Sequence, residues 1–96
     1  MMSYVVLSNW TNDADGREAA YALAESKFAP MLKGLGAINA YFVATSDTTF
    51  TVVTVYPDEA TATAAKEKQD AVRSQAASDL PVKLLGESRG AVFAGV

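Results

Sequence analysis

The middle of the chain, residues 38–56 (INAYFVATSDTTFTVVTVY), predicts a β-hairpin in which neither strand has a purely polar face. Apolar side chains occupy both alternating sets of positions on either side of a polar turn at 46–49. Successive side chains of a strand point to opposite faces, so this hairpin needs an apolar cover on both sides of its sheet. The rest of the chain and a second copy of the chain are the two candidate covers.

The flanking segments complete the element order β-α-β-β-α-β. Residues 4–10 (YVVLSNW) are β-branched and aromatic and predict the first strand. Apolar residues at helical spacing predict a first helix over 15–35 and an alanine-rich second helix over 59–78. The solvated side of the second helix is expected to hold Lys66, Asp70 and Arg73, and its narrow apolar face is expected to comprise Ala60, Ala64, Ala71, Val72 and Ala76. A short strand at 82–85, a turn, and a last strand at 91–96 are expected to close the chain.

Four residues are expected to set the helix boundaries. Asp15 and Asp58 are the predicted N-caps, because a short carboxylate side chain can accept from the free N–H groups of a first turn. Pro30 has no N–H for the preceding turn and predicts a kink or a second short turn. Gly34 is the predicted left-handed end of the first helix.

This element order predicts a single α+β domain over residues 1–96 with a ferredoxin-like fold. Crossover rules place both helices on one face of a four-stranded antiparallel sheet with the strand order 4-1-3-2. In the first strand, we assign Val5, Leu7 and Asn9 to the helix-covered face. The other face is apolar and uncovered, which soluble monomers rarely tolerate. We therefore expect a homodimer through the sheet face, with Tyr41 and Tyr56 as candidate interface residues.

Composition narrows the possible chemistry. The chain has 96 residues, a net charge of −3 and eight basic residues that are scattered singly, so no nucleic-acid partner is expected. It has no Cys and no His, which excludes Cys–His and Ser–His–Asp nucleophiles and a proximal-His haem ligand. We expect neither a cofactor nor a metal. No apolar run is long enough to span a membrane, so we expect a cytoplasmic protein.

With these elements in place, the sequence resembles the dimeric α/β barrel superfamily, in its antibiotic-biosynthesis-monooxygenase-like and stress-responsive branch. The resemblance covers nearly the whole chain and rests on the segments YVVLSNW, FTVVTVYPDEATATAA and GESRGAVFAGV. It implies two sheets paired into a barrel and a cleft between the helices and the sheet of each subunit. Some members are cofactor-independent oxygenases of electron-rich polycyclic aromatics. Others degrade haem, for which the iron-ligating His is missing here.

The aromatic-oxygenase branch uses Asn, Trp, Tyr and Arg to hold and polarise a phenolic substrate, and this chain contains all four residue types. Asn9 is the first catalytic candidate, because its amide can bond to a carbonyl or a developing enolate oxygen. Its alternative role is to stabilise the following loop. Tyr21 is the second catalytic candidate, with core packing as its alternative.

Three further residues are candidates for substrate binding. Trp10 can stack on a ligand, or it can pack at the sheet rim or the dimer interface. Phe28 lies on the buried face of the first helix, where core packing is the alternative. Arg89 can bind an anionic substrate or lie in a solvated turn. Glu87 is the one acid near a strand that is placed to be partly buried.

Two functions remain open at this point. The first is a small-molecule enzyme that oxidises an aromatic carbonyl or phenolic substrate without a cofactor in an apolar helix–sheet cleft. The second is a non-catalytic dimeric module that binds a small apolar ligand or a protein, and the lack of a His as general base near neutral pH favours it. The alanine-rich helix either packs tightly on the sheet or leaves a cavity. A filled cleft, with Tyr21 and Phe28 packed against Leu7 and Val53, would favour the second function.

Overall fold

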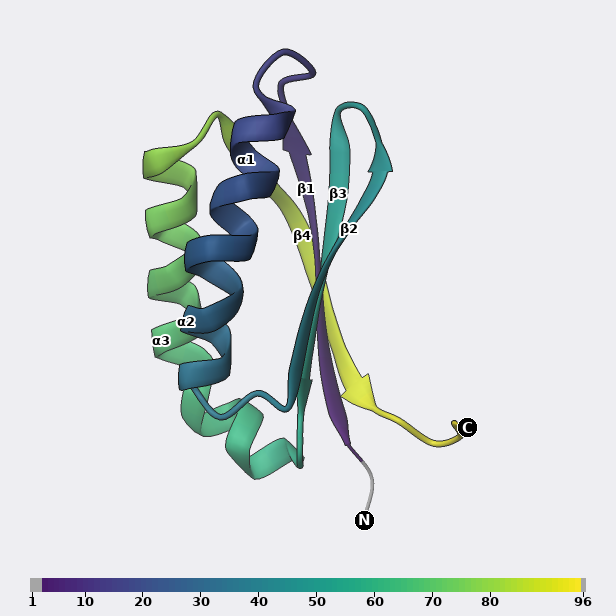
Figure 1. Ribbon diagram of the computed structural model, residues 1–96. Coiled ribbons are helices and arrows are strands. Elements are labelled where there is room, and N and C mark those ends of the chain that lie inside the picture. Colours follow the sequence, from purple (N-terminus) through teal and green to yellow (C-terminus); the bar gives the residue numbers. More distant parts are fainter. Residues whose placement is uncertain (1–2, 96) are drawn as a thin grey trace.

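The computed structural model describes residues 3–95 and has the predicted order of elements. Its elements are β1 (Tyr4–Asn12), α1 (Arg17–Leu23), the π-helical turn η1 (Ala24–Phe28), α2 (Ala29–Gly34), β2 (Asn39–Ser46), β3 (Thr49–Tyr56), α3 (Glu59–Asp79) and β4 (Val82–Ala91). The strands form one antiparallel sheet in the order β2-β3-β1-β4, with all helices on one face (Figure 1). This is the expected order 4-1-3-2 read from the other edge. The α+β ferredoxin-like fold is confirmed.

The alternation in β1 decides which side chains face the helices. Val6, Ser8 and Trp10 are buried, whereas Leu7 and Asn9 are exposed on the opposite face. The assignment of Val5, Leu7 and Asn9 to the helix-covered face is therefore wrong. Trp10 has by far the largest apolar area in this strand, so its burial decides which face meets the helices. Because side chains alternate along a strand, the faces of all other β1 side chains follow from that of Trp10.

The first helical segment is interrupted just before Pro30. The turn η1 ends at Phe28 and α2 follows with Pro30 near its start, so the predicted irregularity takes the form of a π-helical turn. The predicted boundaries differ at both ends. Gly16, not Asp15, is the N-cap of α1 and provides no side-chain bond. Gly34 is still helical, and the left-handed residue is Gly36, with φ 104°.

The N-cap prediction for α3 is confirmed at Asp58. Its carboxylate accepts from the backbone N–H of Thr61 at 2.8 Å and from the Thr61 hydroxyl at 2.7 Å. These two bonds favour the charged form and hold the pKa of Asp58 below its usual range. They satisfy one of the free N–H groups of the first turn and fix the point at which α3 leaves the hairpin.

The buried face of α3 differs from the alanine positions singled out in the sequence. Ala62, Ala65, Gln69 and Val72 face the sheet, whereas Ala60, Ala64 and Ala71, which were expected there, are exposed. Near the start of α3, small side chains allow close packing. The cluster there comprises Val6, Ala37, Tyr56, Ala62 and Ala65. Tyr56 is wholly buried within it, so its expected place at a dimer interface is wrong.

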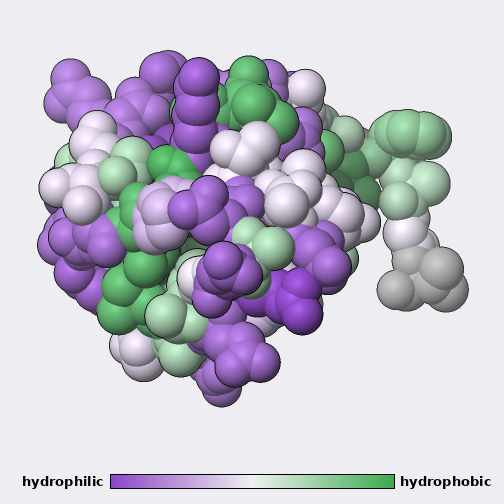
Figure 2. All heavy atoms as spheres, turned by 90° about the horizontal axis from the view of Figure 1, so that it is seen from above, coloured by the Kyte–Doolittle hydropathy of each residue, from purple (hydrophilic) through white to green (hydrophobic). Residues whose placement is uncertain are grey.

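The end of the chain forms one strand where two were expected. β4 runs along β1 without the predicted turn at 86–90. Leu84 pairs with Trp10 and Gly86 with Asn9, so Leu85 is the extra residue of a bulge. After β4, the backbone N–H of Val92 still bonds to the carbonyl of Ser3 at 2.8 Å. The chain then leaves on the uncovered side of the sheet (Figures 1 and 2), and Val96 lies outside the described residues.

The sheet face opposite the helices carries apolar side chains that no described residue covers. Leu7 is 37% exposed, Tyr41 53% and Leu85 61%. Val43 and Phe93 are further exposed apolar residues of the chain. Within residues 3–95, no helix combines the length and the apolar character that crossing a membrane requires.

Candidate functional site

A cleft of about 620 Å³ lies between the helices and the sheet. Residues from every helical segment and every strand line it. They are Ser8, Trp10, Ala20, Tyr21, Ala24, Glu25, Phe28, Ala29, Leu32, Ala40, Tyr41, Phe42, Val43, Ala44, Phe50, Val52, Gln69, Val72, Arg73, Ala76, Leu80 and Val82. Exposed residues of α1, η1 and β2 are among them, which places the mouth along the β2 edge of the sheet.

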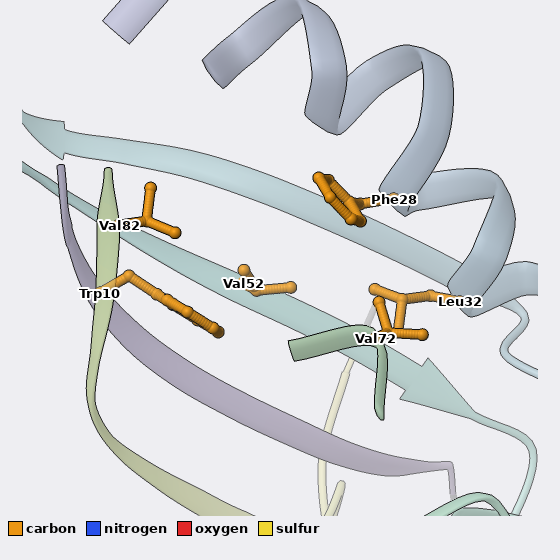
Figure 3. Close-up of a cluster of buried hydrophobic side chains, with 6 residues drawn as sticks. All are labelled: Trp10, Phe28, Leu32, Val52, Val72 and Val82. Carbon is orange, nitrogen blue, oxygen red and sulfur yellow. The ribbon is translucent and has the colours of Figure 1, made fainter. Parts of the chain in front are cut away.

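An aromatic pair forms part of the floor of the cleft. The rings of Trp10 and Phe50, paired across β1 and β3, are stacked with centroids 5.9 Å apart and planes 7° apart. Phe28 and Leu32 point down from η1 and α2 toward Val52 (Figure 3). Flat aromatic surfaces therefore bound the space from the sheet and from the helices. Such surfaces favour a planar apolar ligand.

Small side chains explain why the space stays open. Ala20, Ala24 and Ala29 line it from the first helical segment, and Ala76 lines it from α3. Both interpretations of the alanine-rich helix thus hold, each at one end of α3. Its first turns pack tightly through Ala62 and other small residues, whereas its last turns border the cleft.

A few polar groups converge on the α3 side of this apolar cleft. The indole N–H of Trp10 donates to the hydroxyl of Ser8 at 2.8 Å, and both groups are buried. The hydroxyl of Tyr56 donates to the side-chain oxygen of Gln69 at 2.9 Å. Burial raises the pKa of Tyr56, while the positive charges of Arg89 and Arg73 act in the opposite direction. Tyr56 is therefore a neutral donor that fixes the orientation of Gln69.

Arg73 is the basic residue that lines the cleft, and its side chain is only 12% exposed. Its Nη1 bonds to Oε2 of Glu87 and lies 3.5 Å from Oδ1 of Asp70. Its Nη2 is buried and has no hydrogen-bond partner among the described residues. An unpaired buried N–H group costs free energy that a suitable acceptor would recover. The cleft is therefore bordered by a guanidinium group that has hydrogen-bonding capacity left over.

The structure brings together three of the five predicted site residues. Trp10, Tyr21 and Phe28 all line the cleft, with Tyr21 near its mouth. Asn9 lies on the opposite face of the sheet, where its side-chain oxygen accepts from the hydroxyl of Thr51 at 2.8 Å. Arg89 is on the helix side of β4 but does not line the cleft. The prediction that Asn9 points into the cleft was wrong, because the other alternating set of β1 side chains faces the helices.

Two polar residues of α3 that line the cleft, Gln69 and Arg73, were not among the site residues predicted from the sequence. Gln69 stands between Ala65 and Val72 at the 3–4 spacing of a buried helix face, and a polar residue at a core position was the available signal. Arg73 was predicted to be solvated, but it adjoins the buried face of α3 and its side chain is largely buried. No group of three or more potential metal-ligating side chains occurs within residues 3–95.

Known proteins resemble this chain in structure but not in sequence. No family model and no curated protein matches the sequence. Among solved structures, HapK from Hahella chejuensis superimposes with a TM-score of 0.73 at 14% identity over 99% of this chain and 97% of that chain. The ActVA-Orf6 monooxygenase of Streptomyces coelicolor, solved with the ligand nanaomycin D, gives 0.66 at 17% identity over 99% and 89%.

A third similar structure is SnoaB from Streptomyces nogalater, described as a cofactor-independent oxygenase. Its TM-score is 0.58 at 14% identity, over 100% of this chain and 96% of that chain. The chain shares the ferredoxin-like fold of these proteins. This agrees with the fold that the resemblance implied. At such low identity the likeness establishes the fold, and a function has to be argued from the cleft.

Proposed function

We propose that this protein is a small-molecule enzyme that oxidises a planar aromatic substrate with O₂, without a cofactor, in the helix–sheet cleft. The observation that carries the proposal is the open apolar cleft of about 620 Å³, which has a stacked aromatic pair in its floor and a few polar groups at one side. This combination is what a site for a flat, oxygen-bearing molecule requires. The fold shared with two described oxygenases supports it.

Four of the lining residues have a stated part in this proposal. Trp10 and Phe28 contact the ring faces of the substrate, and Tyr21 contacts the end nearer the mouth. Arg73 takes the place that the sequence suggested for Arg89, because its unpaired Nη2 can donate to a substrate oxygen. No role in this cleft is proposed for Asn9. A fixed donor beside a developing oxyanion stabilises it more than water would.

The proposed chemistry balances without any added reductant. In an anthrone, the central methylene group becomes a carbonyl, which removes four electrons from the carbon. Molecular oxygen accepts these four electrons, so one oxygen atom enters the product and the other leaves as water. The substrate loses a proton to the solvent to form its electron-rich enolate, and a proton is taken up again when the second oxygen atom leaves as water. The protein's part is to bind the ring system, stabilise the enolate oxygen and exclude water.

The test is oxygen uptake with anthrone and with quinols, in buffer containing a metal chelator. We expect uptake above the enzyme-free rate and formation of anthraquinone from anthrone. Ala24→Leu, which places a larger side chain in the cleft, is expected to lower this activity at least tenfold. Ala19→Leu, on the exposed side of α1, is the matched control and should leave it unchanged. Binding without uptake would instead support a ligand-binding module.

We also propose that the protein acts as a homodimer through the uncovered sheet face. One of the similar structures is described as a dimeric ferredoxin-like protein, and it covers 98% of this chain with a TM-score of 0.63. The exposed apolar residues Leu7, Tyr41 and Leu85 lie where a second sheet would pack. Burying such a patch between two copies offsets the small core of a 96-residue chain.

A further inference from the structure

We infer that the substrate of this cleft is an anion, an aromatic molecule whose carboxylate binds beside Arg73. This inference rests on the proposed use of the cleft and adds the charge of the ligand to it. It starts from Nη2 of Arg73, a buried group with no partner among residues 3–95 on a side chain that lines the cleft. Nη1 of Arg73 is paired with Glu87, so it is the N–H groups of Nη2 that lack an acceptor, and a carboxylate is the acceptor that a guanidinium binds best.

The charges around Arg73 do not cancel. Glu87 contacts both Arg73 and Arg89, with Oε1 of Glu87 3.9 Å from Nε of Arg89. The second acidic neighbour, Asp70, is 49% exposed and also pairs with Lys66 at 3.3 Å. Three positive side chains thus share two carboxylates, which leaves one positive charge in the cluster. A ligand with one negative charge balances it.

A second arginine, Arg89, also supports an anionic ligand. Nε of Arg89 is also buried without a hydrogen-bond partner within the described part of the chain. The single carboxylate of Glu87 therefore satisfies neither guanidinium fully. When a ligand carboxylate binds Arg73, Glu87 is free to move closer to Arg89 and to accept a hydrogen bond from it. The ligand carboxylate is then the third acid in a cluster of three positive side chains.

The rest of the lining sets the orientation of such a ligand. Glu25 is the one acidic residue among the described residues that line the cleft, and it is exposed on η1. The helices divide the sheet between them, since α2 contacts β2 while α3 contacts β4 and β1. Glu25 and Arg73 therefore belong to opposite sides of the cleft. Repulsion by Glu25 and attraction by Arg73 both direct the carboxylate toward α3, with the rings along Trp10.

The inference is tested by calorimetric titration with 2-naphthoate and with 2-naphthamide at pH 7. The two probes have the same ring system and nearly the same shape, and they differ in charge. Bonds to charged groups contribute more than neutral ones, so we expect 2-naphthoate to bind about 10- to 100-fold more tightly. Raising the salt concentration should reduce this ratio less than it would for an exposed ion pair.

Substitutions at Arg73 show whether this side chain causes the preference for 2-naphthoate. Arg73→Gln should abolish the preference for 2-naphthoate, and Arg73→Lys, which keeps the charge but not the planar fork, should retain part of it. Arg17→Gln removes the same charge from an exposed pair with Asp47 outside the cleft and should leave the preference intact. Circular dichroism of each variant checks that it is folded.

Equal binding of the two probes, or a preference that survives in folded Arg73→Gln, would overturn the inference. So would failure of 2-naphthoate to bind the wild-type protein. Neither result decides the proposed oxidation, because that is measured separately with neutral anthrone. Oxygen uptake with anthrone but no preference for the naphthoate would leave the enzyme proposal standing and remove only the anionic substrate.

Discussion

Replacing Ala24 by Leu distinguishes an open cleft from a filled core. Ala24 lines the cleft from η1 and is half-buried. Leucine adds three carbon atoms, which would contribute about 2 kcal/mol at roughly 0.8 kcal/mol for each buried methylene. Part of this is lost because the position is partly exposed and because leucine is a slightly weaker helix former than alanine. We expect the free energy of unfolding to stay the same or to rise by up to about 1.5 kcal/mol.

The same substitution in the tight cluster serves as the control. Ala62 is 0% exposed and packs with Val6 and Tyr56 at the first turns of α3. Three added carbons there have no space, and overpacking of this kind costs about 1 to 3 kcal/mol. Ala62→Leu should therefore destabilise the protein, while Ala24→Leu should not. The difference between the two variants is larger than the error of a denaturation measurement.

Urea denaturation followed by circular dichroism measures both variants. All proteins are compared at one concentration, because the stability of a dimer depends on concentration. Trp10 is the only tryptophan and is buried beside the cleft, so its fluorescence reports on the same region. If Ala24→Leu destabilised the protein as much as Ala62→Leu does, side chains would fill the cleft in solution, and the argument for a ligand site would fail.

Three further predictions follow from other parts of the molecule. Leu7→Asp on the uncovered face should reduce the mass measured by light scattering from twice 10.1 kDa to 10.1 kDa, whereas Ala71→Asp on the exposed side of α3 should not. A monomeric mass for the wild-type protein at micromolar concentration would contradict the dimer. Tyr56→Phe should cost about 1 to 3 kcal/mol by leaving the buried oxygen of Gln69 unpaired, and Tyr56→Phe combined with Gln69→Leu should cost less, as urea denaturation will show. Asp58→Ala should destabilise the protein at pH 7. Because the folded-state pKa of Asp58 is lowered, its contribution is fully present above the unfolded value of about 3.9 and is lost as the pH falls through the folded-state pKa, so a difference in stability that did not shrink on acidification would contradict the cap.

The fold could be predicted because the signals for it are local and agree with one another. The apolar periodicity of the hairpin, the cap at Asp58 and the order of the elements all indicate one topology, and the structure has it. The continuation of β4 beyond Leu85 was missed because Gly86 and Gly90 are typical of turns. The pairing with β1 overrides this local preference, and one bulge at Leu85 absorbs the irregularity.

The site could be predicted only in part because it depends on which residues of a strand face the helices. Trp10 and Phe28 were found because large aromatic residues at helix and strand positions indicate buried surfaces, whereas Tyr21 lines the cleft as an exposed residue near its mouth. Asn9 was misplaced because a shift of one residue moves a side chain to the other face, and the sequence of β1 is apolar on both. Arg73 was missed since its burial depends on Glu87, a partner 14 residues away.

The fate of oxygen in the product tests the central claim most directly. Anthrone is incubated with the wild-type protein under ¹⁸O₂ in chelator-containing buffer, and the enzyme-dependent anthraquinone is analysed by mass spectrometry. The account predicts one ¹⁸O atom in each product molecule and loss of this product in Ala24→Leu. Product without ¹⁸O, or the same yield in wild-type protein and Ala24→Leu, would contradict oxidation by O₂ in the cleft.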